Sequence, residues 1–144
     1  MKKIIALVLA IVLCTSFAAF AQPVFDESMN VTVVLDGKTL EFDQKPLVED
    51  GRTLVPVRKI FESLGATVDY DEATETVISR KGNLIIVMQI DNDVMFVNGI
   101  PVKLEVPARE VNWRTLVPLH AISDAMDVDV SWDEVSQTAT LTSK

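Results

Sequence analysis

The chain has 144 residues, 49% of them hydrophobic, and a formal net charge of −8 at pH 7. This acidic balance argues against nucleic acid or anionic lipid as a partner, because both need clustered lysine and arginine. The single cysteine, Cys14, directly follows the apolar N-terminal run, so the rest of the chain has no disulfide, thiol nucleophile or thiolate metal site.

The N-terminus has the order of an export signal. Two lysines precede an unbroken apolar run, Ile4–Leu13, and Ala19–Ala21 is a small-x-small cleavage pattern. We therefore predict a signal peptide at 1–21, a flexible lead at 22–30, and a secreted or envelope-associated protein with no membrane segment after cleavage. An uncleaved anchor is the alternative, but the apolar run is about half of the ~20 residues that a spanning helix needs.

The rest of the chain repeats itself. Gly51–Pro56 (Gly-Arg-Thr-Leu-Val-Pro) returns as Trp113–Pro118 (Trp-Arg-Thr-Leu-Val-Pro), 62 residues further along, and the match extends in both directions without a gap. Self-similarity at a fixed spacing indicates an architecture rather than a catalytic centre. We predict a single domain at 31–144, made of two repeats at about 31–92 and 93–144.

Each repeat is expected to begin with a β-hairpin. Alternating apolar residues lead into Asp36-Gly37 in the first repeat and Asn98-Gly99 in the second. Such pairs favour a tight two-residue turn, because both positions take positive φ. Pro101 cannot donate to a strand ladder, so we place its strand at a sheet edge.

An amphipathic helix is expected after each repeated motif. Pro56 and Pro118 suit a first helical turn, and the following apolar residues lie on one face: Val57, Ile60, Phe61 and Leu64. Gly65 can end the first helix in the left-handed conformation, but Asp127 stands at that place in the second repeat. The second helix should therefore be less well packed and less cleanly terminated.

A second hairpin should follow each helix, and the apolar run Leu84–Met88 between the repeats indicates a strand that is covered on both faces. Together these elements predict an α+β fold. We expect one antiparallel β-sheet, curled around two short α-helices and built from the two repeats.

These motifs resemble a known family. Two copies of Arg-Thr-Leu-Val-Pro, each between a hairpin and an amphipathic helix, are similar to the copper amine oxidase N-terminal-like domain, or stalk domain, over about Val31 to Thr142. The resemblance implies a non-catalytic module, common in secreted proteins of Gram-positive bacteria, with an antiparallel sheet wrapped around helix. The second repeat departs from the first at Trp113, His120 and Asp127.

The family name does not imply copper chemistry here. That chemistry resides in another domain and uses three histidines and a tyrosine-derived quinone, whereas this chain has only His120 and Tyr70. One imidazole cannot form a three-histidine site, and we predict no cofactor, metal or catalytic residue. For His120, a surface or pairing role is expected.

The repeated arginines are the most prominent polar residues of the motif. Each repeat offers an acidic partner, so we predict the structural pairs Arg52–Asp71 and Arg114–Asp133. The alternative is that these arginines bind a carboxylate or a sugar acid.

Acidic residues gather in three segments: Asp69–Glu75, Asp91–Asp93 and Asp127–Glu134. Calcium takes six to eight oxygens, and an EF-hand loop also needs a central glycine and a glutamate at its twelfth position. None of the segments has that spacing, so solvated turn carboxylates are expected, with calcium binding as the alternative.

The two tryptophans have different predicted positions. Trp113 stands at a turn where the first repeat has Gly51, and it is our candidate binding surface for a sugar ring or a partner protein. The alternative is a ring folded onto a neighbouring strand. Trp132, aligned with Tyr70 on an alternating strand, is expected in the core.

The sequence thus favours a secreted, non-catalytic module that acts as a stalk, spacer or docking domain for cell wall polymer or a protein partner. One alternative is a small extracellular carbohydrate- or calcium-binding protein that uses Trp113 and the acidic turns. A minimal hydrolase with paired carboxylates is the third hypothesis.

Overall fold

The computed structural model describes residues 30–144; the predicted signal peptide and nearly all of the predicted lead lie outside this range. The first repeat forms β1 (Thr32–Leu35), β2 (Lys38–Leu40), β3 (Leu47–Glu49), β4 (Arg52–Pro56), α1 (Val57–Ser63), β5 (Thr67–Asp71), β6 (Thr76–Lys81) and β7 (Leu84–Gln89). The second repeat forms β8 (Val94–Val97), β9 (Ile100–Lys103), β10 (Arg109–Val111), β11 (Arg114–Pro118), α2 (Leu119–Met126), β12 (Val128–Asp133) and β13 (Thr138–Ser143). Every element of the first repeat except β7 has a counterpart 62 residues later.

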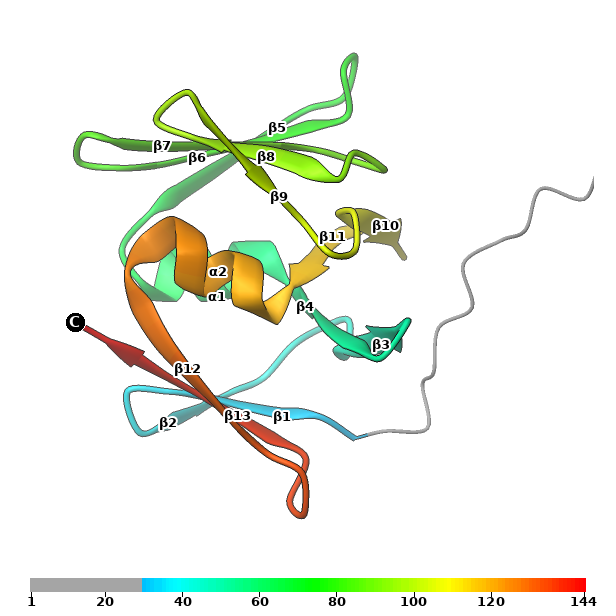
Figure 1. Ribbon diagram of the computed structural model, residues 1–144, viewed down its shortest axis with the longest axis vertical. Helices are drawn as coiled ribbons and strands as arrows, with labels where there is room; N and C mark the ends of the chain where they lie inside the picture. Colours follow the sequence, from blue (N-terminus) through cyan, green and yellow to red (C-terminus); the bar gives the residue numbers. More distant parts are fainter. Residues whose placement is uncertain (1–29) are drawn as a thin grey trace, which may run out of the picture.

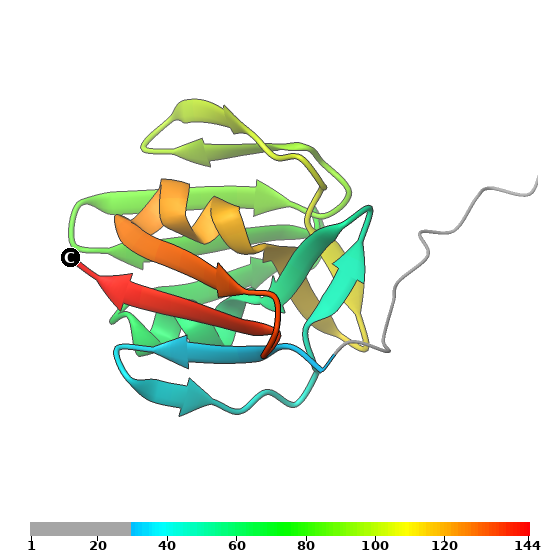
Figure 2. The same ribbon diagram turned by 60° about the horizontal axis from the view of Figure 1, so that its bottom comes forward.

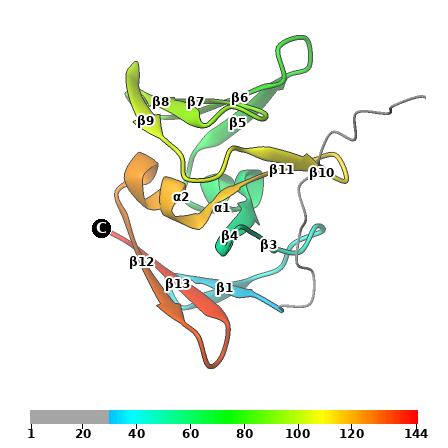
Figure 3. The same cartoon turned by 45° about the vertical axis from the view of Figure 1, so that its right-hand side comes forward.

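The strands form three sheets (Figure 1). The terminal sheet has the order β12-β13-β1-β2, the middle sheet β5-β6-β7-β8-β9, and the motif sheet β10-β11-β4-β3. The terminal and middle sheets lie on opposite sides of the two helices, and the motif sheet lies at one end of the helices (Figures 1 and 3).

The predicted α+β fold with one curled sheet is therefore wrong. Strands hold 52% of the described residues and helices only 13%, and the strands are divided among three sheets. The reason is that the two motif strands pair with each other, Val117 opposite Val55 and Pro118 opposite Leu54. This pairing gives the motif its own sheet and leaves the outer hairpins to form two separate layers.

The repeats interlock through the chain ends. Strand β1 pairs in parallel with β13, with Thr32 opposite Thr138 and Leu35 opposite Leu141, as the adjacent blue and red arrows of Figure 2 show. The terminal sheet therefore combines the first hairpin of repeat one with the last hairpin of repeat two. Neither repeat has a complete sheet system alone.

The first hairpin turn of each repeat forms where the sequence predicts it. Asp36-Gly37 and Asn98-Gly99 have positive φ at both residues, as a tight hairpin turn requires, so the two predicted first hairpins are confirmed. Asp50-Gly51 and Asn112-Trp113 form two further turns of the same kind. The corresponding hairpins β3–β4 and β10–β11 were not predicted, since their strands are only three to five residues long.

The two helices end differently. In α1, Gly65 takes φ +88° and the N–H of Ala66 donates to the carbonyl of Phe61 at 2.9 Å, which is the bonding of a Schellman cap. In α2 the left-handed residue is Asp127, with φ +51°. The prediction of a less well packed second helix is wrong, because α2 buries five residues and α1 three.

The core lies between the sheets and includes the buried residues of both helices. Its most buried members come from both repeats and include Val33, Ile60, Phe61, Met95, Ile122 and Leu141. Strand β7 covers this core with Ile86 and Met88, but Ile85 on its other face is 43% exposed, so the prediction of a strand covered on both faces is wrong. Pro101 lies on β9 at an edge of the middle sheet, as predicted. Within residues 30–144, no helix is long and apolar enough to cross a membrane.

Candidate functional site

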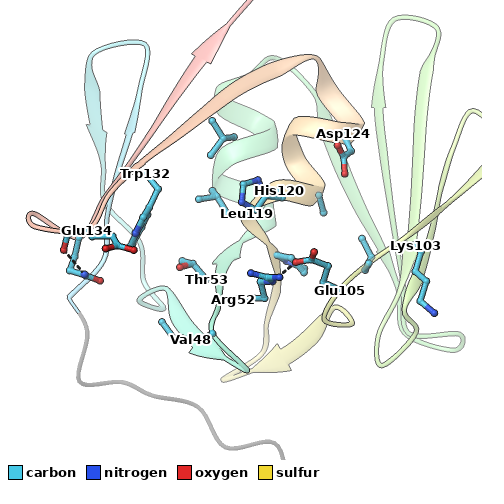
Figure 4. Close-up of a pocket in the computed structure, with 16 residues that line it drawn as sticks. Val48, Arg52, Thr53, Lys103, Glu105, Leu119, His120, Asp124, Trp132 and Glu134 are labelled. Atoms are coloured by element: carbon cyan, nitrogen blue, oxygen red, sulfur yellow. Dashed lines mark hydrogen bonds and ion pairs between the residues drawn. The ribbon is translucent and has the colours of Figure 1, made fainter.

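A cleft of about 760 Å³ opens above α2, between β12–β13 of the terminal sheet and β9 of the middle sheet (Figure 4). We call it the α2 cleft. The residues that give it chemical character are Arg52, Thr53, Glu105, His120, Asp124, Trp132, Glu134 and Gln137, while Lys103 borders the cleft with its side chain directed away from it (Figure 4). They come from both repeats, so only the interlocked fold assembles the cleft.

Trp132 forms one wall of the cleft. It is 38% exposed, so its predicted place in the core is wrong. Its side chain lies on the same face of β12 as Val128, which is buried, and Val130, which is half-buried. Burial thus decreases along the strand from Val128, next to the end of α2, toward the turn. An aromatic face at the edge of the helical layer is left free to contact a ligand.

The turn beyond Trp132 is held by its own hydrogen bonds. Asp133 Oδ1 accepts from the backbone N–H groups of Val135 and Ser136, at 2.9 and 3.2 Å. Gln137 Nε2 donates to the carbonyl of Glu134 at 2.7 Å. Gln137 Oε1 is buried and has no hydrogen-bond partner among the described residues. The fixed turn thus adds an unsatisfied acceptor and the Glu134 carboxylate to this wall.

The floor of the cleft comes from the first turns of α2 and from β4. Leu119 supplies a buried apolar surface, while His120 and Asp124 are exposed on the helix. His120 replaces Arg58 of the first repeat, and its predicted surface position is confirmed. Thr53 contributes a hydroxyl from the motif strand. The floor therefore presents donors and acceptors beside an apolar base.

The opposite wall contains the first repeated arginine. Arg52 forms an ion pair with Glu105, and Lys103 lies 3.6 Å from Asp93. Figure 4 shows the Arg52–Glu105 pair below His120, across the cleft from Trp132. Among the described residues, neither Asp124 nor Glu134 has an ion-pair partner, so the cleft keeps two free carboxylates beside one aromatic ring.

The arginine pairs differ from those predicted. Arg52 pairs with Glu105, and Arg114 pairs at 3.0 Å with Asp43, which is the equivalent of Glu105 in the first repeat. Each hairpin β1–β2 and β8–β9 joins a sheet of the other repeat, so the chain after it passes beside the other repeat's motif strand. The predicted pairs Arg52–Asp71 and Arg114–Asp133 are therefore wrong.

The remaining motif residues lie at turns and at the junctions between strands and helices. Asp71 Oδ1 accepts from the backbone N–H of Ala73 at 2.9 Å and caps the turn after β5, as Asp133 does after β12. Pro56 and Pro118 are buried where β4 and β11 pass into the helices. The repeat thus places the same residue types at equivalent junctions between strands, turns and helices.

The opposite side of the molecule, above α1, carries the equivalent residues of the other repeat. Tyr70 stands in the place of Trp132, and Trp113 in the place of Gly51. The pKa of Tyr70 is raised by partial burial and by the charges of Glu110, Glu75 and neighbouring carboxylates. We call this surface the α1 side.

Trp113 is 88% exposed, so the alternative of a ring folded onto a strand is wrong. It lies at the tip of the β10–β11 hairpin with φ +63°, a conformation that is uncommon for a bulky residue. The base of the turn is held by Asn112, whose Nδ2 donates to Gln44 Oε1 at 2.7 Å, and by Arg114. An anchored turn thus presents a free indole.

The acidic turns do not assemble a metal site in the part of the chain that the structure describes. Within residues 30–144, no group of three or more His, Cys, Asp or Glu side chains is arranged to hold a metal ion. Asp91 instead accepts from Arg109 at 2.6 Å, and Arg109 also contacts the buried Glu49 at 2.8 Å.

Comparison with known proteins gives one result. The family model described as copper amine oxidase N-terminal domain matches residues 34–141, which is most of the chain. No curated protein shows significant similarity. The matched range contains every element of the fold except the ends of β1 and β13, and it includes all residues of the α2 cleft.

Proposed function

Because the chain belongs to the copper amine oxidase N-terminal domain family, whose domain is a non-catalytic accessory module, we propose that it is an exported docking module that binds polysaccharide of the cell envelope in the α2 cleft. The observation that carries the proposal is Trp132, a half-exposed indole on the wall of a cleft rich in hydrogen-bonding groups.

The chemistry of the cleft suits a sugar ring. An indole face packs against the C–H face of a pyranose, while the sugar hydroxyls at the ring edge need both donors and acceptors. Asp124 and Glu134 offer exposed acceptors, and Thr53 and His120 can donate. A ligand hydroxyl that reached Gln137 Oε1 would satisfy an acceptor that the protein leaves unpaired.

The N-terminal sequence supports the export that this function needs. Two lysines, the apolar run Ile4–Leu13 and the small residues at Ala19–Ala21 have the order of a cleavable signal. The acidic surface keeps such a protein soluble outside the cell. The target that we propose is the polysaccharide of the Gram-positive cell wall.

The test uses the two tryptophans as a matched pair. The purified protein is incubated with isolated Gram-positive cell wall, and bound protein is measured after sedimentation over a concentration series. We expect saturable binding that Trp132→Ala weakens at least about tenfold, which is about 1.4 kcal/mol, and that Trp113→Ala leaves unchanged. Absence of saturable binding, or equal losses in both variants, would contradict a polysaccharide site in the cleft.

A second candidate function is docking of a protein partner on Trp113. Two observations favour it: the backbone of Trp113 has a positive φ, which costs free energy, and its indole is exposed and so gives the isolated domain no packing energy. This function predicts the opposite pattern. Trp113→Ala would abolish cross-linking to an envelope protein in intact cells, whereas Trp132→Ala would retain it.

A further inference from the structure

The outer face of the middle sheet carries a row of apolar side chains. Register places Ile78, Val87, Phe96 and Pro101 directly opposite one another on β6, β7, β8 and β9. The alternate residues Val77, Met88 and Met95 are buried against the helices, so the row faces away from the core. Phe96 is 42% exposed, and Ile85, two residues from Val87 on the same face, is 43% exposed.

The terminal sheet shows that the fold does not need this row. Its outer face places Thr140, Val34 and Thr39 opposite one another, and these are the repeat equivalents of Ile78, Phe96 and Pro101. Hydroxyl groups are the usual choice for a sheet face in water, whereas contiguous apolar side chains mark an interaction site. Strand β7, which lacks a repeat equivalent, adds Val87 and Ile85 to the apolar face.

We propose that a second copy of this chain packs on the outer face of the middle sheet, with the apolar row of one copy against that of the other. A two-fold axis along β7, the central strand, would place Val87 on Val87 and Ile78 on Phe96. The contact would then be isologous, the self-complementary type that closes as a dimer.

The charges on this face fit that arrangement. The outward residues include two acids, Asp69 and Asp71, and two bases, Arg80 and Lys103, so the face is balanced although the chain carries a net charge of −8. The two-fold axis brings β5 of one copy over β9 of the other. Asp69 of each copy would therefore lie over Pro101 of its partner, two residues along the strand from Lys103 and within reach of that long side chain.

The size of the face can be compared with that of a standard interface. Five strands about 4.8 Å apart and four to six residues long give a flat area of roughly 20 by 20 Å. Because protruding side chains expose more area than the flat projection, the face approaches the ~800 Å² per partner of a standard interface. Facing sheets of this kind pack about 10 Å apart, with their strands within about 30° of parallel.

The test measures the mass of the purified protein by sedimentation velocity from about 1 µM to about 1 mM. We expect dimers. Phe96→Thr should weaken association at least about tenfold, whereas Val34→Thr at the equivalent position of the terminal sheet should have no effect. Circular dichroism of both variants checks the fold. A monomer over the whole range, or equal effects of both substitutions, would overturn the proposal.

Charge reversal tests the geometry without touching the apolar row. Lys103 and Asp69 have side chains 80% and 69% exposed, so their substitution leaves the core intact. We expect Lys103→Glu to weaken the dimer at least threefold, and the double variant Lys103→Glu, Asp69→Lys to restore association to within about twofold of the original. A double variant no better than the single one would overturn the two-fold arrangement.

Discussion

On the α2 side of the molecule, Gly51 sits beside an open cleft whose wall is Trp132, whereas on the α1 side Trp113 and Tyr70 occupy the equivalent positions. The two sides have equivalent strands, an equivalent helix and an equivalent arginine–carboxylate pair between the repeats. The difference lies in side chains at turns and strand ends, where the core imposes no shape. The duplication thus supplies two equivalent arrangements of strands and helix, and a few surface substitutions give each one different exposed side chains.

The ion network of Glu49, Arg109 and Asp91 breaks the symmetry most strongly. Val111 and Leu47 stand at the repeat equivalents of Glu49 and Arg109. The Glu49 side chain is 5% exposed, and its hydrogen bonds with Arg109 raise the pKa of that guanidinium. Glu49→Ala leaves Arg109, whose side chain is 21% exposed, with Asp91 as its remaining partner, so we expect a loss of about 1.5–3 kcal/mol in the free energy of unfolding, measured with urea.

A double variant sharpens this prediction. Glu49→Val with Arg109→Leu installs the apolar residues of the other repeat and removes both charges together. It should recover most of the stability lost by Glu49→Ala, because a buried ion pair and a well-packed apolar pair are of similar stability. A double variant as unstable as the single one would mean that the network itself, rather than the orphaned charge, stabilises the domain.

Exchanging the turn residues would test the contrast between Trp113 and Gly51. Trp113→Gly removes a bulky residue from φ +63° and should raise the unfolding free energy by about 1 kcal/mol. Gly51→Trp should lower it by a similar amount, since Gly51 has φ +74°. Urea denaturation measures both changes. If Trp113→Gly destabilised the protein, the indole would be contributing packing energy and would not be a free binding surface.

The helix ends allow a smaller exchange of the same kind. Asp127→Gly places the residue type of Gly65 at the left-handed end of α2 and should stabilise the protein by about 0.5 kcal/mol. Gly65→Asp should destabilise it by about 1 kcal/mol, because α1 would lose the residue best suited to its Schellman cap. Thermal melting compares the two variants, and a stabilising Gly65→Asp would contradict this account of the caps.

The α1 side can be probed by titration, with the smallest effect on stability. Tyr70 is the only tyrosine, so its ionisation is read directly by ultraviolet absorbance. We expect its pKa above 10, because partial burial and nearby carboxylates disfavour the phenolate. Glu110→Gln should lower that pKa. A raised pKa in the folded state means that the stabilisation is complete below pH 10 and declines as the pH rises through the folded pKa.

Much of the local structure could be predicted from the residues. The Asp-Gly and Asn-Gly turns, the helix stripe that ends at Leu64, and Pro101 at an edge strand all follow from short-range preferences of the chain. The site could be predicted only in part. Gln137 and Asp124 belong to no repeated motif, and Trp132 has the alternation of a core residue, so no local signal distinguishes a cleft wall from a core position.

The repeat, the hairpin turns, the helix stripes and the membership of the family could all be predicted from the residues alone, because each depends on residues close together in the chain. Three contacts became visible only in the folded protein: the motif strands pair with each other, β1 joins β13, and Arg52 contacts Glu105. These contacts join residues far apart in sequence, and either arginine had several acidic residues available. Which acid lies within reach is fixed only when the two repeats interlock.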